Sequence, residues 1–537
     1  MAWNEVYPRP QMKRESFYSL NGTWKLDGRS INVPFPPQSI LSGYEGEIRD
    51  EMIYECGFSL PEGFLPEGYR LLIHFGAVDQ TAKVYLNGVF ITFHEGGYLP
   101  FSSDITDALA GGENLLRVEV RDDLNPVYPY GKQRKKRGGM WYTPVSGIWQ
   151  GVWLEAVPQR HIESVRILPD LSGITLTVVS QAEWCDAEID GKTVRIDTNR
   201  AVRIPVENPR LWTCDDPHLY ALHLRTENDR VESYFALRTV EIRGKRICLN
   251  GKPVFLNGVL DQGYFQDGIY LPENPEEYEK DVLRMKKLGF NLLRKHCKVE
   301  PEAFYHACDR LGMLVMQDMV NSGAYSFICD TALPTIGFNR RDDRRFARRD
   351  AARKAFFTRH ALEMQMHLHN HPCVIAYTIF NEGWGQFDAD RHYRLLKEAD
   401  ASRIYDATSG WFWQNNSDVD SLHIYFRTKK LRPGNRPMLL SECGGFVFPV
   451  KGHVFNENAK YGYSRSANDA AEFTAMIENM WEKMILPAIP LGLCGVIITQ
   501  LSDVEDEING MYTYDREVLK VLPERMRALK EKANQLL

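Results

Sequence analysis

The feature that most constrains the fold is a change of pattern after Asn250-Gly251. From there on, short apolar runs of strand type alternate with stretches that have apolar residues at helical spacing. The first helix is predicted to begin at Asn274-Pro275 and to end before Gly289. Roughly 290 residues of such alternation predict a (β/α)8 TIM barrel, whose chemistry occurs at the carboxyl ends of the strands. The predicted strands are Phe290–Leu293, Leu314–Met316, Cys373–Phe380, Ser421–Tyr425, Met438–Leu440 and Gly495–Thr499.

The first 240 residues contain short strand-like runs, and no long amphipathic helix precedes residue 160. Asn87-Gly88 and Asp190-Gly191 each stand between two such runs, which is a strong signal for a two-residue hairpin turn. We therefore expect a multidomain chain with an all-β sandwich over residues 1–158 and a small immunoglobulin-like β-sandwich over 159–242. The predicted barrel occupies residues 243–537.

Composition and charge exclude several classes of protein. A formal net charge of -6 and a pI of about 6.2 argue against nucleic acid as a partner. The N-terminal segment has no apolar leader and the sequence has no run of 18 apolar residues, which predicts a cytoplasmic protein with no membrane partner. The ten cysteines form no C-x-x-C pair, and His367, His369 and His371 lack the i,i+4 spacing of helical metal ligands. No metal or other cofactor is predicted.

Two predicted barrel strands end in a glutamate that is followed by a glycine-rich loop. Glu382 lies in Asn381-Glu-Gly-Trp-Gly, and Glu442 lies in Ser441-Glu-Cys-Gly-Gly. A carboxylate at a buried strand end is costly unless it has a partner or a task. Glycoside cleavage needs two carboxyl groups, because one protonates the leaving oxygen while the other attacks the anomeric carbon or activates water. The alternative for either glutamate is a helix cap or an ion pair with an arginine.

Further segments, in the same order along the chain, resemble family 2 glycoside hydrolases, which include β-galactosidases, β-glucuronidases and β-mannosidases. The resemblance spans nearly the whole chain and implies an N-terminal jelly-roll sugar-binding domain, the immunoglobulin-like domain and a catalytic TIM barrel. It also implies a retaining enzyme, with Glu382 as general acid/base and Glu442 as nucleophile. The similar segments are His74–Asp79, Val84–Gly88, His94–Phe101, Ser146–Trp149, Asn208–Trp212 and Gly251–Gly258.

The resemblance implies roles for residues near the two glutamates. Asn381 would hydrogen-bond the 2-hydroxyl of the sugar, a contact that strengthens in the transition state. Arg294 would lie beside Glu442 and hold its carboxylate ionised. Tyr425 would hydrogen-bond the same nucleophile.

Four more residues are candidates around the same site. His296 is expected to contact the sugar, although in better-known family members the histidine lies one residue further from the arginine. Trp384 and Trp411 follow barrel strands, where each either stacks on a sugar ring or packs in the core. Asp318 is either a helix cap or an acid that supports the catalytic residues.

Three departures from the family bear on the identity of the sugar. Glucuronidases bind the sugar carboxylate with an Asn-x-Lys pair near the end of the barrel. The matching stretch here begins Glu505-Asp506-Glu507, and its acidic residues would repel a carboxylate, which disfavours a glucuronide. Gln500 stands where a tryptophan usually floors the glycone site. Asp261 and Gln262 stand where β-galactosidases have an Asn-Arg-His-Glu run, so that Gln262 replaces a sugar-binding histidine.

We expect a retaining exo-β-glycosidase that acts on terminal non-reducing β-linked sugars, with a β-galactosidase-like glycone favoured. A β-galacturonidase, β-mannosidase or arabinosidase of the same family and a catalytically silent carbohydrate-binding homologue are the alternatives. The expected partner is an oligosaccharide or glycoside, and homo-oligomerisation is left open. The basic run Lys132–Arg137 is either a solvated loop or a border of the pocket that selects an anionic aglycone. Arg340–Arg349 is predicted to be an exposed helix with ion pairs.

Overall fold

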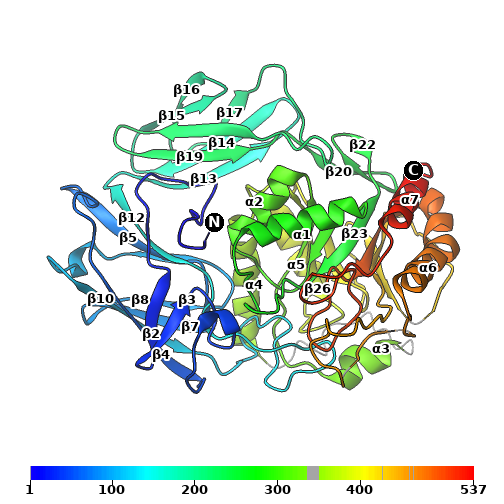
Figure 1. The fold of residues 1–537 in the computed structure, drawn as a ribbon. Helices are drawn as coiled ribbons and strands as arrows, with labels where there is room; N and C mark the ends of the chain where they lie inside the picture. Colours follow the sequence, from blue (N-terminus) through cyan, green and yellow to red (C-terminus); the bar gives the residue numbers. More distant parts are fainter. Residues whose placement is uncertain (1, 336–349, 426, 459, 464) are drawn as a thin grey trace.

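The computed structural model describes residues 2–335, 350–425, 427–458, 460–463 and 465–537. Figure 1 shows two β-sandwiches, in blue to cyan and in cyan to green, beside a barrel that runs from green to red. This arrangement confirms the multidomain fold predicted from the sequence. Among the described residues, every helix is too short or insufficiently apolar to span a lipid bilayer.

Two antiparallel sheets form the N-terminal sandwich and bury their apolar faces against each other. The predicted hairpin is present, because Asn87 and Gly88 join β7 to β8 with φ angles of 51° and 81°. The sheet orders are β1-β12-β5-β9 and β3-β2-β4-β10-β7-β8, and a small sheet pairs β11 with β6. The elements are β1 Tyr18–Ser19, β2 Gly22–Leu26, β3 Arg29–Val33, η1 Ile40–Ser42, β4 Glu51–Phe58, β5 Tyr69–Phe75, β6 Val78–Asp79, β7 Thr81–Leu86, β8 Val89–Glu95, β9 Phe101–Asp104, η2 Thr106–Ala108, β10 Asn114–Arg121, β11 Gly147–Ile148 and β12 Val152–Pro158.

The second sandwich is smaller and has sheet orders β13-β14-β17 and β16-β15-β18-β19. Asp190 and Gly191 form its predicted hairpin turn between β15 and β16, with φ angles of 49° and 74°. A short antiparallel sheet, β20-β21-β22, then leads into the barrel. The strands are β13 Ile162–Pro169, β14 Gly173–Ser180, β15 Trp184–Ile189, β16 Lys192–Asp197, β17 Val202–Pro205, β18 Tyr220–Arg225, β19 Arg230–Phe235, β20 Val240–Arg243, β21 Arg246–Leu249 and β22 Lys252–Pro253.

Within the described part of the barrel, eight strands follow the order β27-β26-β25-β24-β23-β30-β29-β28. The strand pairs within this order are parallel, and β27 lies against β28, so the barrel is nearly closed. Parallel strands put all their carboxyl ends on one face, where the predicted site residues lie. The strands are β23 Leu256–Asp261, β24 Leu292–Lys295, β25 Leu314–Asp318, β26 Val374–Asn381, β27 Ile404–Ser409, β28 Asp420–Ile424, β29 Met438–Gly444 and β30 Leu493–Thr499.

The helices pack outside the strands, and the first begins where the sequence predicts. The Asn274 side chain accepts a hydrogen bond from the backbone N–H of Glu276 at 3.1 Å, and Pro275 immediately precedes α1. Gly312 ends α2 in the left-handed conformation, with φ 71°. The helices are α1 Glu276–Lys287, α2 Glu302–Leu311, η3 Phe327–Ala332, α3 Leu333–Thr335, α4 Ala351–His367, α5 Ala389–Ala399, α6 Ala470–Met480, η4 Trp481–Ile485, η5 Leu486–Leu491 and α7 Pro523–Asn534.

The alternation of strands and helices is less regular than the sequence suggests. Among the described residues, no helix separates β27 from β28 or β28 from β29. The sequence did not reveal β27, because polar Asp406, Thr408 and Ser409 interrupt its apolar pattern. Strand β24 begins two residues later than predicted, and the side chain of Asn291 bonds the backbone of Phe255 and Asn257 at the start of β23. The predicted helix Arg340–Arg349 lies outside the described residues.

Candidate active site

Arg294, at the carboxyl end of β24, holds the centre of the site together. It is fully buried, and its guanidinium donates to Asp318 at 2.9 Å, to Asn381 Oδ1 at 2.8 Å and to Glu442 Oε1 at 3.1 Å. Burial alone would lower its pKa, but the carboxylates of Asp318 and Glu442 raise that pKa above its usual value. Arg294 is therefore a permanent cation that fixes three side chains from three other strands.

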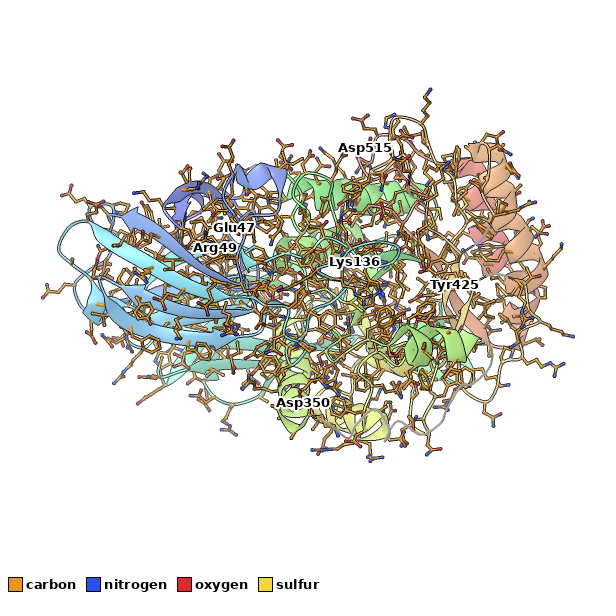
Figure 2. The ribbon with its side chains drawn as sticks, turned by 90° about the horizontal axis from the view of Figure 1, so that it is seen from below. Glu47, Arg49, Lys136, Asp350, Tyr425 and Asp515 are labelled. Atoms are coloured by element: carbon orange, nitrogen blue, oxygen red, sulfur yellow. The ribbon has the colours of Figure 1, made fainter. Side chains whose placement is uncertain are left out.

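Glu442, on β29, is a buried carboxylate with a donor on each oxygen. Arg294 donates to Oε1, and the Tyr425 hydroxyl donates to Oε2 at 2.5 Å. Burial favours the neutral acid, but the nearby His423, Arg294 and other donors outweigh burial and lower the pKa of Glu442 to about 2. Glu442 is therefore ionised at neutral pH. Figure 2 shows Tyr425 on the barrel side of the molecule, away from the sandwich strands.

Glu382 follows β26 directly and turns toward Glu442. Its φ of 51° is left-handed, and Gly383 and Gly385 continue the turn with φ of 73° and 64°. One oxygen of Glu382 lies within 4.8 Å of one oxygen of Glu442, and His423 lies between them. His423 Nδ1 is 2.8 Å from Glu382 Oε1 and 3.4 Å from Glu442 Oε2.

His423 was not among the residues that sequence reasoning selected. Its Nε2 lies 3.0 Å from Ser409 Oγ, which orients the ring between the two glutamates. A signal was available, because His423 and Tyr425 are two residues apart on β28 and its end and therefore point to the same side. Trp411 lies beside this histidine, with ring centroids 6.2 Å apart, and is half-buried.

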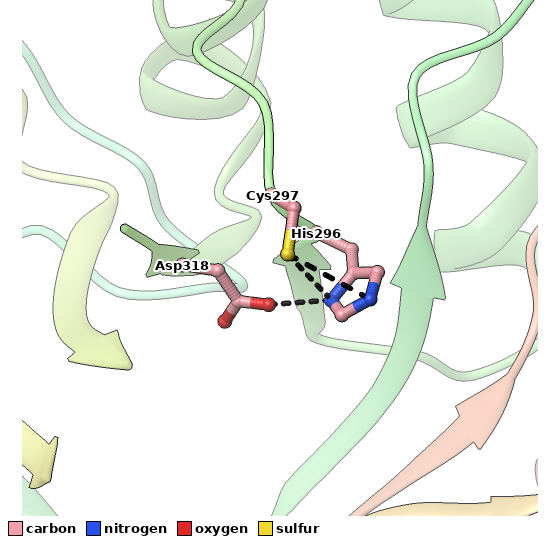
Figure 3. Close-up of side chains that lie close together, drawn as sticks. All are labelled: His296, Cys297 and Asp318. Carbon is pink, nitrogen blue, oxygen red and sulfur yellow. Dashed lines mark hydrogen bonds and ion pairs between the residues drawn. The ribbon is translucent and has the colours of Figure 1, made fainter. Parts of the chain in front are cut away.

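His296, Cys297 and Asp318 form a second buried group at the same end of the barrel, shown in Figure 3. His296 Nδ1 and Asp318 Oδ2 are 2.5 Å apart, and the Cys297 sulfur lies 3.8 Å from the same nitrogen. Asp318 also accepts from Arg294, so both of its oxygens are engaged within the protein. Burial lowers the pKa of His296, which favours the neutral ring. These contacts describe a hydrogen-bonded support for the site rather than a set of free metal ligands.

Several buried polar atoms at this face have no hydrogen-bond partner among the described residues. They are Asn381 Nδ2, Trp384 Nε1, Gln262 Oε1 and both side-chain polar atoms of Gln500. Each such atom costs about 1–3 kcal/mol if it stays unsatisfied. Sugar hydroxyls are donors and acceptors of the type that would satisfy them. Asp261 differs, because it pairs with Lys295 at 2.5 Å and accepts from the backbone of Gly263.

Three sequence models of one family match this chain in succession. The family 2 sugar binding domain of glycosyl hydrolases matches residues 31–158, the general family 2 model matches 161–238, and the family 2 TIM barrel domain matches 240–433. The chain belongs to glycosyl hydrolase family 2. One match falls in each of the three parts seen in the structure, and the match to the barrel ends at residue 433.

Curated relatives of this family 2 chain include two β-galactosidases. That of Thermoanaerobacter pseudethanolicus is 25% identical over 481 residues, covering 81% of this chain and 60% of the relative. That of Aeromonas hydrophila is 30% identical over 461 residues, covering 77% of this chain and 42% of the relative. The family 2 chain thus spans about two to three fifths of the length of these relatives.

Solved structures of β-glucuronidases share the fold of this family 2 chain. The enzyme from an uncultured Clostridium species superposes with a TM-score of 0.77 at 20% identity, covering 99% of both chains. The enzyme from Dictyoglomus thermophilum gives a TM-score of 0.77 at 18% identity, again covering 99% of both.

The N-terminal sandwich of this family 2 chain also reaches the barrel face. The Tyr142 hydroxyl donates to Glu507 Oε2 at 2.5 Å, and the backbone N–H of Thr143 donates to Glu505 Oε1 at 2.9 Å. Asn509 donates to the other oxygen of Glu507 at 3.0 Å. The acidic run that the sequence analysis placed near the sugar thus has partners from both domains.

Proposed function

We propose that this chain hydrolyses terminal β-glycosides with retention of anomeric configuration. The observation that carries the proposal is the approach of Glu382 and Glu442, whose nearest oxygens lie within 4.8 Å. Carboxyl groups about 5–5.5 Å apart are typical of retaining enzymes, whereas inverting enzymes need about 6.5–9.5 Å to admit a water molecule. An approach of one oxygen of each group to within 4.8 Å is compatible with the shorter, retaining separation, and on this basis we assign direct attack to Glu442.

In the first step Glu442 attacks the anomeric carbon, and the bond to the leaving oxygen breaks as Glu382 protonates that oxygen. The low pKa of Glu442, about 2, supports its role as the ionised nucleophile. Asn381 is held by Arg294 through Oδ1, which leaves its Nδ2 free to donate to the sugar 2-hydroxyl. This contact stabilises the transition state in which charge develops on the ring.

In the second step water attacks the anomeric carbon of the glycosyl-enzyme and releases Glu442. Glu382, deprotonated by the first step, accepts the proton of that water and so returns to its starting state. His423 lies within hydrogen-bonding range of Glu382 and close to Glu442, so it can keep the two carboxyl groups in register through both steps.

The glycone we favour is galactose-like, either neutral or oxidised at C6 to a galacturonide. The named relatives include β-galactosidases, and the solved structures that share the fold include β-glucuronidases. Mannosides and arabinosides are the other sugars to test. A silent carbohydrate-binding homologue is the outcome to exclude.

The test uses Glu442→Gln and Glu382→Gln on a panel of 4-nitrophenyl β-glycosides. We expect Glu442→Gln to fold normally and to lose at least about 10³-fold in kcat, because no glycosyl-enzyme can form. Proton NMR of the first product formed by the native chain should show the β-anomer. Substantial turnover by Glu442→Gln, an α-anomer first product, or sugar binding without release by the native chain would each contradict the proposal.

A further inference from the structure

The loop between β10 and β11 belongs to the N-terminal sandwich but is built into the barrel face. The backbone N–H of Tyr130 donates to Asn321 O at 3.0 Å, and Asn321 Nδ2 donates back to Gly131 O at 3.2 Å. A side chain at Gly131 would come within 2.7 Å of the Cys297 carbonyl, so glycine permits this close approach. In Figure 2, Lys136 of the same loop lies between the sandwich strands and the barrel.

This loop carries Lys132 to the site, next to the residues around Glu382. Lys132 is only 6% exposed, and its ammonium lies 4.6 Å from the ring centre of Trp384 and 6.0 Å from that of Trp141. Trp384 is the second residue after Glu382 and also packs near His296, with ring centroids 6.2 Å apart. The side chain of Lys132 is therefore packed at the wall of the site, beside the residues that follow Glu382.

The Lys132 ammonium makes no contact ion pair with a described residue, although the Glu507 carboxylate lies close enough to interact with its charge. Among the described residues, no carboxylate oxygen lies within 4.0 Å of its nitrogen and no hydrogen bond forms to it. Contact with two indole rings partly offsets the cost of removing this charge from water. A buried charge that lacks a hydrogen-bonded partner is otherwise unfavourable, so the three donors of this ammonium are suited to an anion brought by a ligand.

The positive charge of Lys132 acts on two residues of the barrel face, His296 and Glu507. Burial lowers the pKa of His296, and the positive charge of Lys132 lowers that pKa further. Burial raises the pKa of Glu507, and the same lysine partly opposes that rise. His296 and Glu507 also interact electrostatically with Glu442, whose carboxylate attacks the glycone in the proposed function.

We propose that Lys132 binds a carboxylate on the terminal sugar, so that the chain prefers uronic-acid glycosides such as a β-galacturonide. The inference rests on the proposed function and names its substrate class. It revises the sequence argument from Glu505 and Glu507, because both acids already accept hydrogen bonds from within the protein. The lysine then selects a carboxylate that those acids would otherwise repel.

The test compares 4-nitrophenyl β-D-galactopyranoside with the matching β-D-galacturonide, and the β-D-glucoside with the β-D-glucuronide. We expect the native chain to prefer the acid in at least one pair. Lys132→Gln should lower kcat/KM for that acid about 10- to 100-fold, the range for a hydrogen bond to a charged group, and should change the neutral partner less than about threefold. Lys132→Arg should keep the preference, and exposed Lys136→Gln should leave both values unchanged.

Preference for the neutral sugar in both pairs, or an equal loss for both members in Lys132→Gln, would overturn the inference. The inference would also be overturned if Lys132 raised kcat/KM only for neutral sugars whose aglycone carries a carboxylate. Thermal shifts with free D-galacturonate and D-galactose separate this test from the hydrolase proposal. If no glycoside is cleaved, the hydrolase proposal fails, while stabilisation by galacturonate that is lost in Lys132→Gln still supports the lysine. Equal thermal shifts with galacturonate in the native chain and in Lys132→Gln would count against a role for Lys132.

Discussion

Glu442 accepts hydrogen bonds on both carboxylate oxygens, from Arg294 and from Tyr425. Burial of the carboxyl group would favour its protonated form, but these donors and His423 bring its pKa down to about 2. A carboxylate with such a pKa is ionised throughout the pH range in which most proteins function. Each donor that is removed moves the pKa back toward the value set by burial.

Tyr425→Phe tests this balance, because it removes the donor to Glu442 Oε2 without removing the ring that stacks on Tyr463. Glu442 must be ionised to react, so activity is lost as pH falls through its pKa. Raising that pKa should move the acid limb of kcat/KM to higher pH and lower kcat by about 10- to 100-fold. The measurement is a pH–rate profile beside that of Tyr85→Phe, in the N-terminal sandwich. An acid limb that does not move would show that Tyr425 leaves the nucleophile unaffected.

The sequence identifies the residues of the site that belong to strand ends. Glu382 and Glu442 stand out because a carboxylate after an apolar strand is costly without a reason to be there. Lys132 and Tyr142 are different, since their part in the site depends on contacts across more than 150 residues of chain. No local pattern encodes such contacts. His423 is an intermediate case. The strand that carries it was predicted, but the side of the strand to which its side chain points was not considered.

At the scale of the element, the turn after β26 is what aims Glu382 at its partner. Glu382 and Gly383 are both left-handed, with φ of 51° and 73°. A Cβ atom at Gly383 would overlap the ring of Phe412, which is 1% exposed and cannot move aside easily. The turn therefore depends on glycine for both its conformation and its packing.

Gly383→Ala should displace Glu382 and lower kcat by at least about 100-fold, because small misplacements of a catalytic group are costly. Gly63→Ala is the matched control, since Gly63 has φ 76° but open space around its Cα. Both variants carry the backbone strain of alanine in this conformation, of order 1–3 kcal/mol. Only Gly383→Ala should lose turnover. Equal activity in the two variants would mean that the turn tolerates a side chain.

The elements of the barrel were predictable where apolar runs are uninterrupted, as in β26, β29 and β30. The segments after β27 and β28 were not predictable, because among the described residues neither contains the helix that normally separates two barrel strands. The polar residues of β27 are buried and form hydrogen bonds inside the protein. Asp406, for example, accepts a hydrogen bond from Ser421 of β28 at 2.8 Å. A pattern method that counts apolar residues has no means of recognising such a strand.

At the scale of the molecule, Arg14 ties the two sandwiches together. Its side chain is 4% exposed and contacts Glu155 of β12 at 3.1 Å and Asp229, between β18 and β19, at 2.9 Å. Burial would raise the pKa of Glu155, but Arg9, His74 and Arg14 hold that pKa well below its usual value. The stability this gives is present above the usual glutamate pKa of about 4.3 and is lost as pH falls through the folded value.

Arg14→Met should destabilise the sandwiches by about 3–5 kcal/mol at neutral pH, because it leaves buried carboxylates short of a partner. The neighbouring Lys13→Met is the control, since the Lys13–Glu232 pair is more than half exposed and contributes at most about 1 kcal/mol. Urea unfolding should show the loss in the earliest transition, and the difference from the native chain should shrink in acid. A loss no larger than that of Lys13→Met would argue against the network.

The loop between β10 and β11 has a consequence for how such proteins diversify. It contributes Tyr142 and Lys132 to the face on which the barrel presents its two glutamates. Recombination that joins this barrel to the sandwich of another lineage would import new recognition chemistry while preserving the bond-breaking pair. Conversely, a barrel expressed alone would lack the side of the site that Lys132 and Tyr142 provide.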